Sequence, residues 1–258
     1  MNSVTRKQDI DSALKKLRLA GMRDIFEESV IKARNEGMDY ADFLHMLLLH
    51  ERDTRKKHRV ERFLKTSRLP LSKTYSALDL ARFPFKTRQR INAVLDGGFI
   101  ERKENIIVFG PPGTGKTHLV CAIGQEQIKA GKRILFCTAG LLVQRLLAAK
   151  KEFRLEAEMK KLAKYDAVII DDIGYVQYER GEMEVLFMFL SECYEQRSVM
   201  ITSNLAFSKW DTIFKDPMTA AAAIDRLVHH CVIIELTSIL SYRAEVAKKN
   251  NRKEKKET

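Results

Sequence analysis

Apolar residues recur at spacings of three and four along the first part of the chain, up to about residue 73. Ile10, Leu14 and Leu17, for example, fall on one face when the segment is wound as a helix. Pro70 then ends this pattern, because proline disfavours helical backbone at the residue before it. The pattern predicts a small all-helical N-terminal domain over residues 1–75.

Beyond this segment the pattern changes to short apolar runs of strand length, each followed by a helical stretch. Strands that are apolar on both faces are typical of a parallel sheet covered by helices. The runs predict strands at residues 105–109, 133–138, 167–170, 198–202 and 232–236. We therefore expect an α/β domain over residues 76–248, followed by a charged flexible tail at 249–258 that lacks apolar anchors.

Charge indicates the kind of partner. Lys and Arg number 46 against 34 Asp and Glu, which gives a formal net charge of +12. Such an excess favours a polyanionic partner, with nucleic acid as the leading candidate. The alternative is that basic surface residues only keep the protein soluble. Because the excess is clustered along the chain, nucleic acid is the better interpretation.

The composition also argues against a membrane or secreted protein. No stretch approaches the ~18 consecutive apolar residues of a membrane helix, and the N-terminus has no apolar signal-peptide core. The four cysteines are scattered, without CxxC pairs or the spacing of a metal site. We expect a cytoplasmic protein with no membrane partner, whose cysteines are buried thiols.

One cluster of positive charge lies at the end of the helical N-terminal region. From Arg52 to Lys73 the chain carries nine Lys and Arg against two acidic residues. Contact with DNA phosphates is one interpretation, and a solvated helix face is the other. The candidate DNA contacts here are Arg55, Lys56, Lys57 and Arg59.

The strongest chemical signal is GPPGTGKT, from Gly110 to Thr117, which matches GxxxxGK[ST] between a predicted strand and a predicted helix. Its glycines let backbone amides surround phosphates, and the helix start presents its positive end to the same anion. Lys116 places an ammonium on the β and γ phosphates, while the Thr117 hydroxyl is a ligand for Mg²⁺. We expect ATP and Mg²⁺ as cofactors, held by Gly110, Pro111, Pro112, Gly113, Thr114, Gly115, Lys116, Thr117 and His118.

Two carboxylates follow the apolar run at residues 167–170. Asp171 and Asp172 lie at the carboxyl edge of the predicted sheet, where nucleotides bind in α/β proteins. We assign Asp171 to the magnesium shell and Asp172 to polarising the attacking water, although the Asp172 side chain is short for a general base. The alternative is a solvent-facing acidic turn.

The next predicted strand delivers Thr202, Ser203 and Asn204 to the same edge. An asparagine here would orient the attacking water or sense the γ phosphate. A strand-end asparagine is otherwise a common turn former. Both interpretations of Asn204 remain open on the residues alone.

Arginines follow on predicted helices after the sheet. A guanidinium aimed at the transferred phosphoryl group stabilises its negative charge, and a neighbouring subunit would supply one if two subunits shared a site. Arg226 and Arg243 are the candidates, with pairing of Arg226 to Asp225 or to a helix end as the alternative. His229 and His230 show no evident metal or catalytic partner, so we expect a structural role.

Five motifs occur in a fixed order between residues 76 and 245, and they are GPPGTGKTHL, VIIDDIGY, ITSN, DRL and SYR. The set resembles IstB-like transposition helper ATPases and their relatives, the DnaC and DnaI helicase loaders. The resemblance implies an AAA+ P-loop NTPase that assembles into rings or spirals with ATP at the subunit interfaces. It implies that Asn204 is sensor 1, Arg226 the arginine finger and Arg243 sensor 2. By the same resemblance Lys116 and Thr117 are Walker A residues, and Asp171 with Asp172 is the Walker B pair.

The resemblance also implies a helical insertion after the second core strand that faces DNA inside the assembly. Residues 141–164 occupy that position, and side chains spaced by three and four along a helix can follow a phosphate backbone. The alternative is a surface helix whose basic residues pair with Glu152, Glu156 and Glu158. The candidate DNA contacts are Arg145, Lys150, Lys151, Arg154, Lys160 and Lys161.

The function that these features imply is an ATP-dependent, DNA-binding ATPase. We expect it to help the transposase of the same insertion sequence select or engage double-stranded target DNA. One alternative is a DnaC-type loader that binds a replicative helicase and single-stranded DNA. Another is an ATP-dependent scaffold with little turnover, because Asp172 stands where many relatives have Glu.

Overall fold

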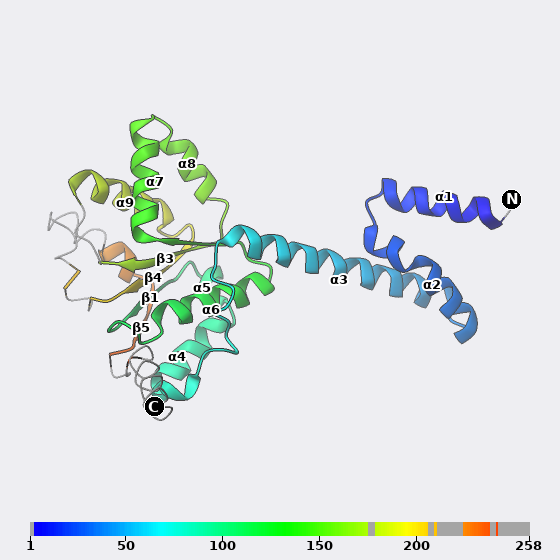
Figure 1. Ribbon diagram of the computed structural model, residues 1–258, viewed down its shortest axis with the longest axis horizontal. Coiled ribbons are helices and arrows are strands. Elements are labelled where there is room, and N and C mark those ends of the chain that lie inside the picture. The colour runs from blue at the N-terminus through cyan, green and yellow to red at the C-terminus, as the bar shows by residue number, and fades with distance from the viewer. Residues whose placement is uncertain (1–2, 175–178, 206–208, 211–223, 238–240, 242–258) are drawn as a thin grey trace, which may run out of the picture. The chain divides into compact units, whose positions relative to one another are not determined.

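The computed structural model describes residues 3–174, 179–205, 209–210, 224–237 and 241. The chain divides into two compact units, residues 1–62 and 63–258 (Figure 1). The predicted tail at 249–258 lies outside the described residues.

The first unit consists of helices, as the spacing of its apolar residues predicts. It contains α1 (Ser3–Lys16), α2 (Ala20–Glu36) and most of α3 (Tyr40–Ser67), which continues into the second unit. α2 ends where Gly37 adopts left-handed backbone, with φ 60°, and donates its N–H to the carbonyl of Ala33. Met22 and Leu47 are the buried apolar side chains among the described residues of this unit.

A buried carboxylate joins α2 to α3 within the first unit. Glu51 Oε2 accepts the backbone N–H of Met22 at 2.9 Å, and Glu51 Oε1 accepts Arg55 Nε at 2.6 Å. Burial acts to raise the pKa of Glu51, but these hydrogen bonds and the Arg55 charge outweigh it, so the net pKa is lowered. Arg55 also donates to the carbonyl of Arg18 at 2.9 Å. One of the four predicted DNA contacts in α3 therefore has a role inside the unit.

The second unit is built on a parallel sheet, and within the described residues its strand order is β2-β3-β4-β1-β5. The strands coincide closely with the predicted apolar runs. Apolar side chains on both faces of the sheet are what favoured parallel strands in the sequence. Their bounds are β1 (Asn105–Phe109), β2 (Ile134–Thr138), β3 (Ala167–Ile173), β4 (Ser198–Ser203) and β5 (Cys231–Glu235).

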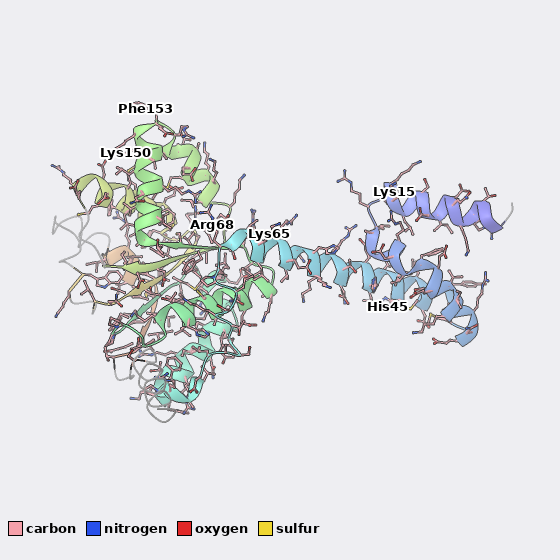
Figure 2. All side chains as sticks on the ribbon, viewed as in Figure 1. Lys15, His45, Lys65, Arg68, Lys150 and Phe153 are labelled. Atoms are coloured by element: carbon pink, nitrogen blue, oxygen red, sulfur yellow. The ribbon has the colours of Figure 1, made fainter. Side chains whose placement is uncertain are left out.

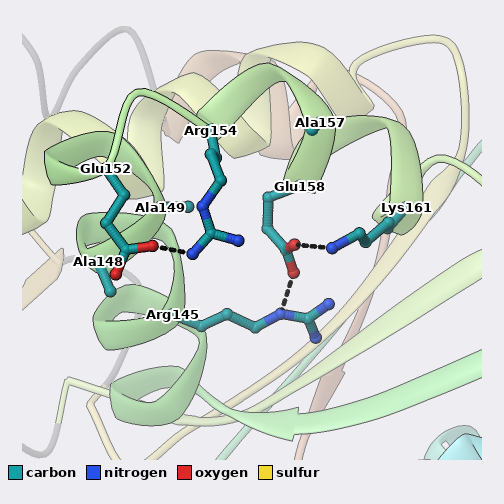
Figure 3. Close-up of a pocket in the computed structure, with 8 residues that line it drawn as sticks. All are labelled: Arg145, Ala148, Ala149, Glu152, Arg154, Ala157, Glu158 and Lys161. Atoms are coloured by element: carbon teal, nitrogen blue, oxygen red, sulfur yellow. Dashed lines mark hydrogen bonds and ion pairs between the residues drawn. The ribbon is translucent and has the colours of Figure 1, made fainter.

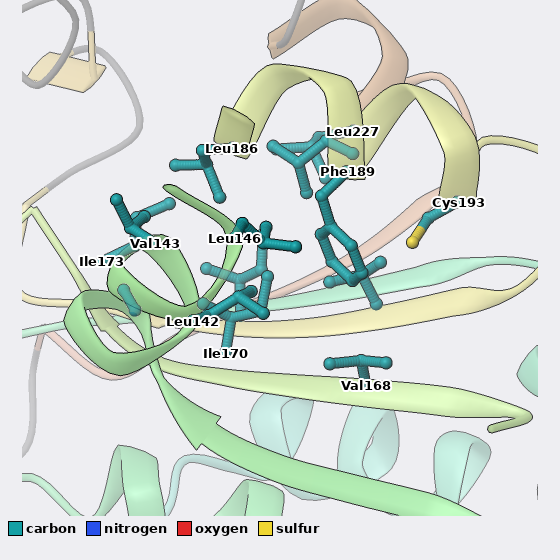
Figure 4. Close-up of a cluster of buried hydrophobic side chains, with 14 of the residues drawn as sticks. Leu142, Val143, Leu146, Val168, Ile170, Ile173, Leu186, Phe189, Cys193 and Leu227 are labelled. Carbon is teal, nitrogen blue, oxygen red and sulfur yellow. The ribbon is translucent and has the colours of Figure 1, made fainter. Parts of the chain in front are cut away.

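Helices cover both faces of this sheet (Figure 1). The first group comprises α4 (Phe85–Leu95), α5 (Gly98–Glu101) and α6 (Lys116–Lys129), preceded by the short 3-10 helix η1 (Leu80–Arg82). The opposite face is covered by α7 (Ala139–Lys151), α8 (Leu155–Leu162) and α9 (Arg180–Cys193). There, Leu142 and Leu146 of α7 and Phe189 of α9 pack over Val168 and Ile170 of β3 (Figure 4). The predicted α/β fold with a parallel sheet flanked by helices is confirmed.

The strand order determines where chemistry can occur. β1 pairs with β4, and β4 pairs with β3, so the carboxyl ends of these three strands are adjacent. These are the ends that carry the glycine-rich loop, Asn204 and the two aspartates. In parallel sheets, ligands bind beyond the carboxyl ends of the strands.

The segment after α3 belongs to the second unit. Gln125 of α6 donates its side-chain N–H groups to the carbonyls of Pro70 at 3.2 Å and Lys73 at 3.0 Å. His118 Nε2 lies 2.9 Å from the carbonyl oxygen of Thr74. The division after residue 62 is therefore earlier than the expected boundary at residue 75, because α6 holds the intervening chain by hydrogen bonds between residues that are distant in the sequence.

All four cysteines are free, with Cys121 and Cys193 buried and Cys137 and Cys231 half-buried. Burial raises the pKa of each thiol to about 12. They are therefore protonated at neutral pH and poor nucleophiles. None of the helices within the described ranges combines the length and the apolar character that a membrane crossing requires.

Candidate nucleotide site

The glycine-rich loop connects β1 to α6. Gly113 and Gly115 have left-handed backbone, with φ 81° and 96°, and Gly115 caps the start of α6. A β-carbon at Gly113 would clash with Ser241 Oγ and would stand on backbone that side chains rarely adopt, so glycine is strongly favoured there. A β-carbon at Gly115 would meet no atom within 4 Å, so the space beside it is open toward the helix start. Backbone amides at this helix N-terminus form a site that favours anions.

Lys116 crosses the loop and reaches the end of β4. Its Nζ donates to the carbonyls of Gly110 at 2.8 Å and Pro111 at 3.0 Å, and to Asn204 Oδ1 at 2.6 Å. The Lys116 side chain is buried, with 5% exposed. Two residues that lie 88 positions apart in the sequence are thus brought together at one point.

Asp171 lies two residues before the end of β3, buried beside the start of α6. Thr202 Oγ1 donates to Asp171 Oδ1 at 2.6 Å. The pKa of Asp171 is raised overall, mainly by burial and also by the charge of Asp172. Hydrogen bonds from Thr202 and Thr117 and the charge of Lys73 act in the opposite direction. Burial disfavours the ionised form of this carboxylate, and a nearby cation would stabilise that form.

Asp172 has a different environment from its neighbour. Its side chain is exposed and lines a cavity, and its backbone is left-handed with φ 61°. Its N–H donates to Thr202 Oγ1 at 2.8 Å. The two aspartates therefore have distinct positions, one buried beside α6 and one in the cavity wall.

The cavity has a volume of about 760 Å³, within the ~300–1,000 Å³ of small-molecule sites. The loop and the first turn of α6, including His118, form one wall, and Asp172 and Asn204 are also part of the lining. The segment from Lys73 to Phe83 forms another wall, with Ala77, Leu78 and Phe83 as apolar members. The sequence does not predict this second wall, because its position depends on the hydrogen bonds to Gln125 and His118 described above.

The two candidate arginines differ in what the structure describes. The Arg226 guanidinium lies over the Phe187 ring, 5.0 Å from its centroid, and Arg226 is not among the residues that line the cavity of its own chain. Arg243 lies outside the described residues. The structure thus brings together the loop, Asp171, Asp172 and Asn204, but not Arg226.

His229 and His230 have a neighbour that the sequence did not reveal. Glu195, His229 and His230 each place one possible ligand atom within 4.8 Å of the others, and all three are exposed. The Tyr194 hydroxyl lies 3.1 Å from His229 Nδ1. The cluster lies outside the lining of the cavity.

In the helical insertion at residues 141–164, basic residues form ion pairs with acidic ones, which is the alternative to DNA contact considered from the sequence (Figure 3). Glu158 accepts both Arg145 and Lys161, and it lies in a second cavity of about 240 Å³ between α7 and α8. Burial acts to raise the pKa of Glu158, but hydrogen bonds from the two basic residues lower it overall. The remaining pairs are Arg154 with Glu152, Lys160 with Glu156 and Lys150 with Glu184.

An aromatic residue projects from the same insertion. Phe153 lies at the turn between α7 and α8 (Figure 2), it is 99% exposed, and its backbone is left-handed with φ 54°. Such backbone is unusual for a bulky side chain. Glu152 and Arg154 flank it in the sequence, and Lys151 precedes Glu152. The sequence does not single out Phe153, because exposure of an aromatic at a turn leaves no periodic signal.

Comparison with known proteins matches residues 12–251 to a family described as IstB-like ATP binding protein. The chain belongs to this family. It is 39% identical over 235 residues to a putative insertion sequence ATP-binding protein of Sinorhizobium fredii, covering 91% of this chain and 78% of the relative. It is 34% identical over 241 residues to the insertion sequence IS21 putative ATP-binding protein of Pseudomonas aeruginosa, covering 93% and 91%.

Solved structures share the fold of this IstB-like chain. DnaI matches with a TM-score of 0.56 at 19% identity, covering 66% of this chain and 95% of DnaI. AMPPCP-bound DnaA from Aquifex aeolicus matches with a TM-score of 0.56 at 18% identity, covering 72% and 56%. At these identities the likeness concerns the fold alone, which is that of AAA+ P-loop NTPases.

Proposed function

We propose that the protein binds ATP with Mg²⁺ in the cavity beside the glycine-rich loop and hydrolyses it. The observation that carries this proposal is the convergence of Lys116, Asp171 and Asn204 at the adjacent ends of β1, β3 and β4. The names of the insertion-sequence relatives and the membership of the IstB-like family support ATP as the nucleotide.

The residues present fit a triphosphate and its metal. The left-handed glycines, the open space at Gly115 and the N-terminus of α6 form an anion cradle. The Lys116 ammonium would exchange the Asn204 and carbonyl contacts for phosphate oxygens. Thr117 and Asp171 would hold Mg²⁺, which neutralises charge on the phosphates when bound. Oxygen ligands of this kind are the ones that Mg²⁺ prefers.

The apolar wall gives the cavity a place for the base of the nucleotide. Ala77, Leu78 and Phe83 face the same cavity as the loop, so a ligand with a flat apolar end and a polyanionic end fits both walls. His118 lines the cavity, as the direct nucleotide contact expected from the sequence requires. It would also support the apolar wall, since its ring nitrogen lies 2.9 Å from the carbonyl oxygen of Thr74.

We infer that Asp172 directs the attacking water, with Asn204 beside it. Both line the cavity, and the Asp172 side chain is exposed to it. Because the side chain of an aspartate is shorter than that of a glutamate, the backbone position of residue 172 decides how far its carboxylate extends into the cavity. That backbone is left-handed, with φ 61°.

The second part of the proposal is binding of duplex DNA by the basic residues of α3 and of the insertion. Lys56, Lys57 and Arg59 are exposed on α3. In the insertion, Lys160 and its partner Glu156 are 75% and 82% exposed, so this pair contributes little and exchanges readily for a phosphate. Phe153 adds an exposed aromatic surface among these charges, and aromatic side chains stack on bases or wedge between them.

We propose that ATP joins protomers into a ring or spiral, with Arg226 acting on the nucleotide of a neighbour as the arginine finger and Arg243 acting as sensor 2. The position of Arg226 outside the lining of its own cavity fits a role across an interface. The partner would be the transposase of the same insertion sequence. The insertion-sequence names of the relatives favour this partner over a replicative helicase, whose loaders share only the fold.

Steady-state phosphate release tests this function. Purified protein should hydrolyse ATP only with Mg²⁺, and duplex DNA should stimulate the rate. Single-stranded DNA in place of duplex separates the transposition helper from the helicase loader. Mg²⁺-dependent ATP binding without any turnover, with or without DNA, would identify a scaffold instead of an ATPase.

A further inference from the structure

The two aspartates occupy a break in the pairing between β3 and β4. The parallel register is regular up to Ile170, which lies opposite Ile201, and it resumes with Ile173 opposite Ser203. Between these pairs, Asp171 and Asp172 on β3 face a single residue, Thr202, on β4. Two residues opposite one is the definition of a β-bulge, a feature that redirects side chains next to active sites.

The hydroxyl of Thr202 bridges both residues of the bulge. It donates to Asp171 Oδ1 at 2.6 Å and accepts the N–H of Asp172 at 2.8 Å. A hydroxyl has one proton to donate, and here it is donated to Asp171, so the oxygen is left to accept the N–H of Asp172. The two bonds together fix the orientation of the hydroxyl. Thr202 is fully buried, with 0% exposed, and solvent therefore does not compete for either bond.

The bulge changes where the two carboxylates lie. In a regular strand, neighbouring side chains point to opposite faces, so only one of two consecutive aspartates would face a given site. Here Asp171 interacts with Thr117 at the start of α6, and Asp172 lines the cavity that contains this same helix start. The left-handed backbone of Asp172, disfavoured for a residue with a β-carbon, accompanies the change.

We propose that Thr202 is a positioning residue for hydrolysis, whose hydroxyl holds Asp171 in place as a metal ligand and keeps Asp172 turned into the cavity. This inference rests on the proposed ATPase function. Thr202 does not line the cavity itself, so it acts through the two aspartates and not on the nucleotide. The bulge and its Thr202 bridge thereby keep Asp172 in the cavity wall while Asp171 stays buried beside α6.

Substitutions at Thr202 separate positioning from simple support of the strand. Thr202→Val keeps the shape and removes the hydroxyl. Thr202→Ser keeps the hydroxyl and removes the methyl group. We expect Thr202→Val to lower kcat by about tenfold or more while KM for ATP changes by less than about threefold. The concentration of Mg²⁺ that gives half-maximal rate should rise several-fold, and Thr202→Ser should restore both quantities.

A second pair of variants covers the case in which Thr202→Val does not fold. Thr202→Ser and Thr202→Cys have nearly the same size and shape, but a thiol is the weaker donor and acceptor. If the Thr202 hydroxyl positions the two aspartates, the cysteine variant should have the lower kcat and should need more Mg²⁺ for half-maximal rate. Equal kcat and equal Mg²⁺ dependence in the serine and cysteine variants, both folded, would overturn the proposal, as would a folded Thr202→Val variant that matches wild type.

The failure of the proposed function is distinguishable from the failure of this inference. If the wild-type protein binds ATP but does not turn it over, the ATPase proposal is wrong. The effect of Mg²⁺ on ATP affinity then remains as the readout for Asp171. Thr202→Val or Thr202→Cys should still weaken that effect several-fold relative to Thr202→Ser, and an unchanged effect would overturn the role of Thr202 as well.

Discussion

The loop beside α6 and the insertion formed by α7 and α8 both concentrate charge, but they hold it in opposite ways. Lys116 and Asp171 are each only 5% exposed and are fixed by short hydrogen bonds. Lys160 and Glu156 of the insertion are mostly exposed. A buried charge is costly unless its partners are well placed, so the first region suits one ligand geometry. An exposed ion pair contributes little to stability and is easily exchanged, so the second region suits any phosphate backbone.

The largest effect should follow from removing the buried lysine. Lys116→Ala should abolish nucleotide-dependent assembly and lower the rate of ATP hydrolysis at least about a hundredfold, because the Lys116 ammonium lies inside the loop, against the carbonyls of Gly110 and Pro111. Lys129→Ala is the matched control, since Lys129 lies at the other end of α6 and pairs with Glu126 on the surface. Unchanged assembly and turnover in Lys116→Ala would contradict the assignment of the site.

The next effect separates the two aspartates. Asp172→Asn should bind ATP with Mg²⁺ normally and lower kcat by roughly a hundredfold, since loss of a positioned base typically affects only the reaction step. Asp171→Asn should in addition weaken Mg²⁺-dependent ATP binding. Binding measured by calorimetry and phosphate release measured in parallel distinguish them. Identical profiles for the two variants would contradict their separate roles.

In the insertion, the effect should appear in DNA affinity and leave the nucleotide site intact. Replacing Lys150, Lys151 and Lys160 by alanine should weaken duplex binding. The slope of log affinity against log salt should fall by about one for each DNA phosphate that the variant no longer neutralises. ATP binding should not change. Fluorescence anisotropy over a salt series measures this, and an unchanged slope would show that the ion-paired surface does not bind DNA.

Replacing Phe153 by glycine should raise the stability of the fold slightly and weaken DNA binding. Phe153→Gly should stabilise the fold by about 0.5–1 kcal/mol, because glycine tolerates the left-handed backbone. Phe153→Ala lacks that benefit and serves as the control. Both variants should bind DNA less tightly, by roughly 1–3 kcal/mol if the ring stacks on a base. Thermal melts and DNA titrations with both variants test the pair, and equal DNA affinity to wild type would exclude stacking.

The smallest effect should come from the exposed pair itself. Lys160→Ala should leave the melting temperature unchanged within error, since both side chains of this pair are mostly in solvent.

Glu51→Gln provides the contrast and should lower the melting temperature at neutral pH. Glu51 is buried, and its lowered pKa means that its ionised form stabilises the first unit. That contribution should be present at neutral pH and lost as the pH falls through the lowered pKa. A melt series from pH 7 to acid checks both.

The strands and the nucleotide loop were predictable because their signals are local. The run at Asn105–Phe109 is apolar on both faces and flanked by glycines and a lysine at fixed spacing, so pattern and chemistry agreed. β3 extends to Ile173, beyond the predicted end at residue 170, because the bulge lets pairing resume after the aspartates. An apolar run that ends in acidic residues gives no sign of this continuation.

The second wall of the cavity and the role of Thr202 could not be predicted for a different reason. Both depend on hydrogen bonds between residues that are far apart in the sequence, such as Gln125 with Pro70 and Thr202 with Asp171. Side-chain identity alone does not reveal which carbonyl or carboxylate a donor will meet. The ion pair between Arg145 and Glu158 is a similar case, although its acidic partner was named among the possible ones.

Calorimetric titration of ATP into the wild-type protein, with Mg²⁺ and then with excess chelator, measures directly whether the cavity beside Lys116 is a nucleotide site. We expect saturable binding of one ATP per chain in Mg²⁺, weaker binding without the metal, and none in Lys116→Ala. If folded wild-type protein shows no binding of ATP in the presence of Mg²⁺, the cavity beside Lys116 is not a nucleotide site.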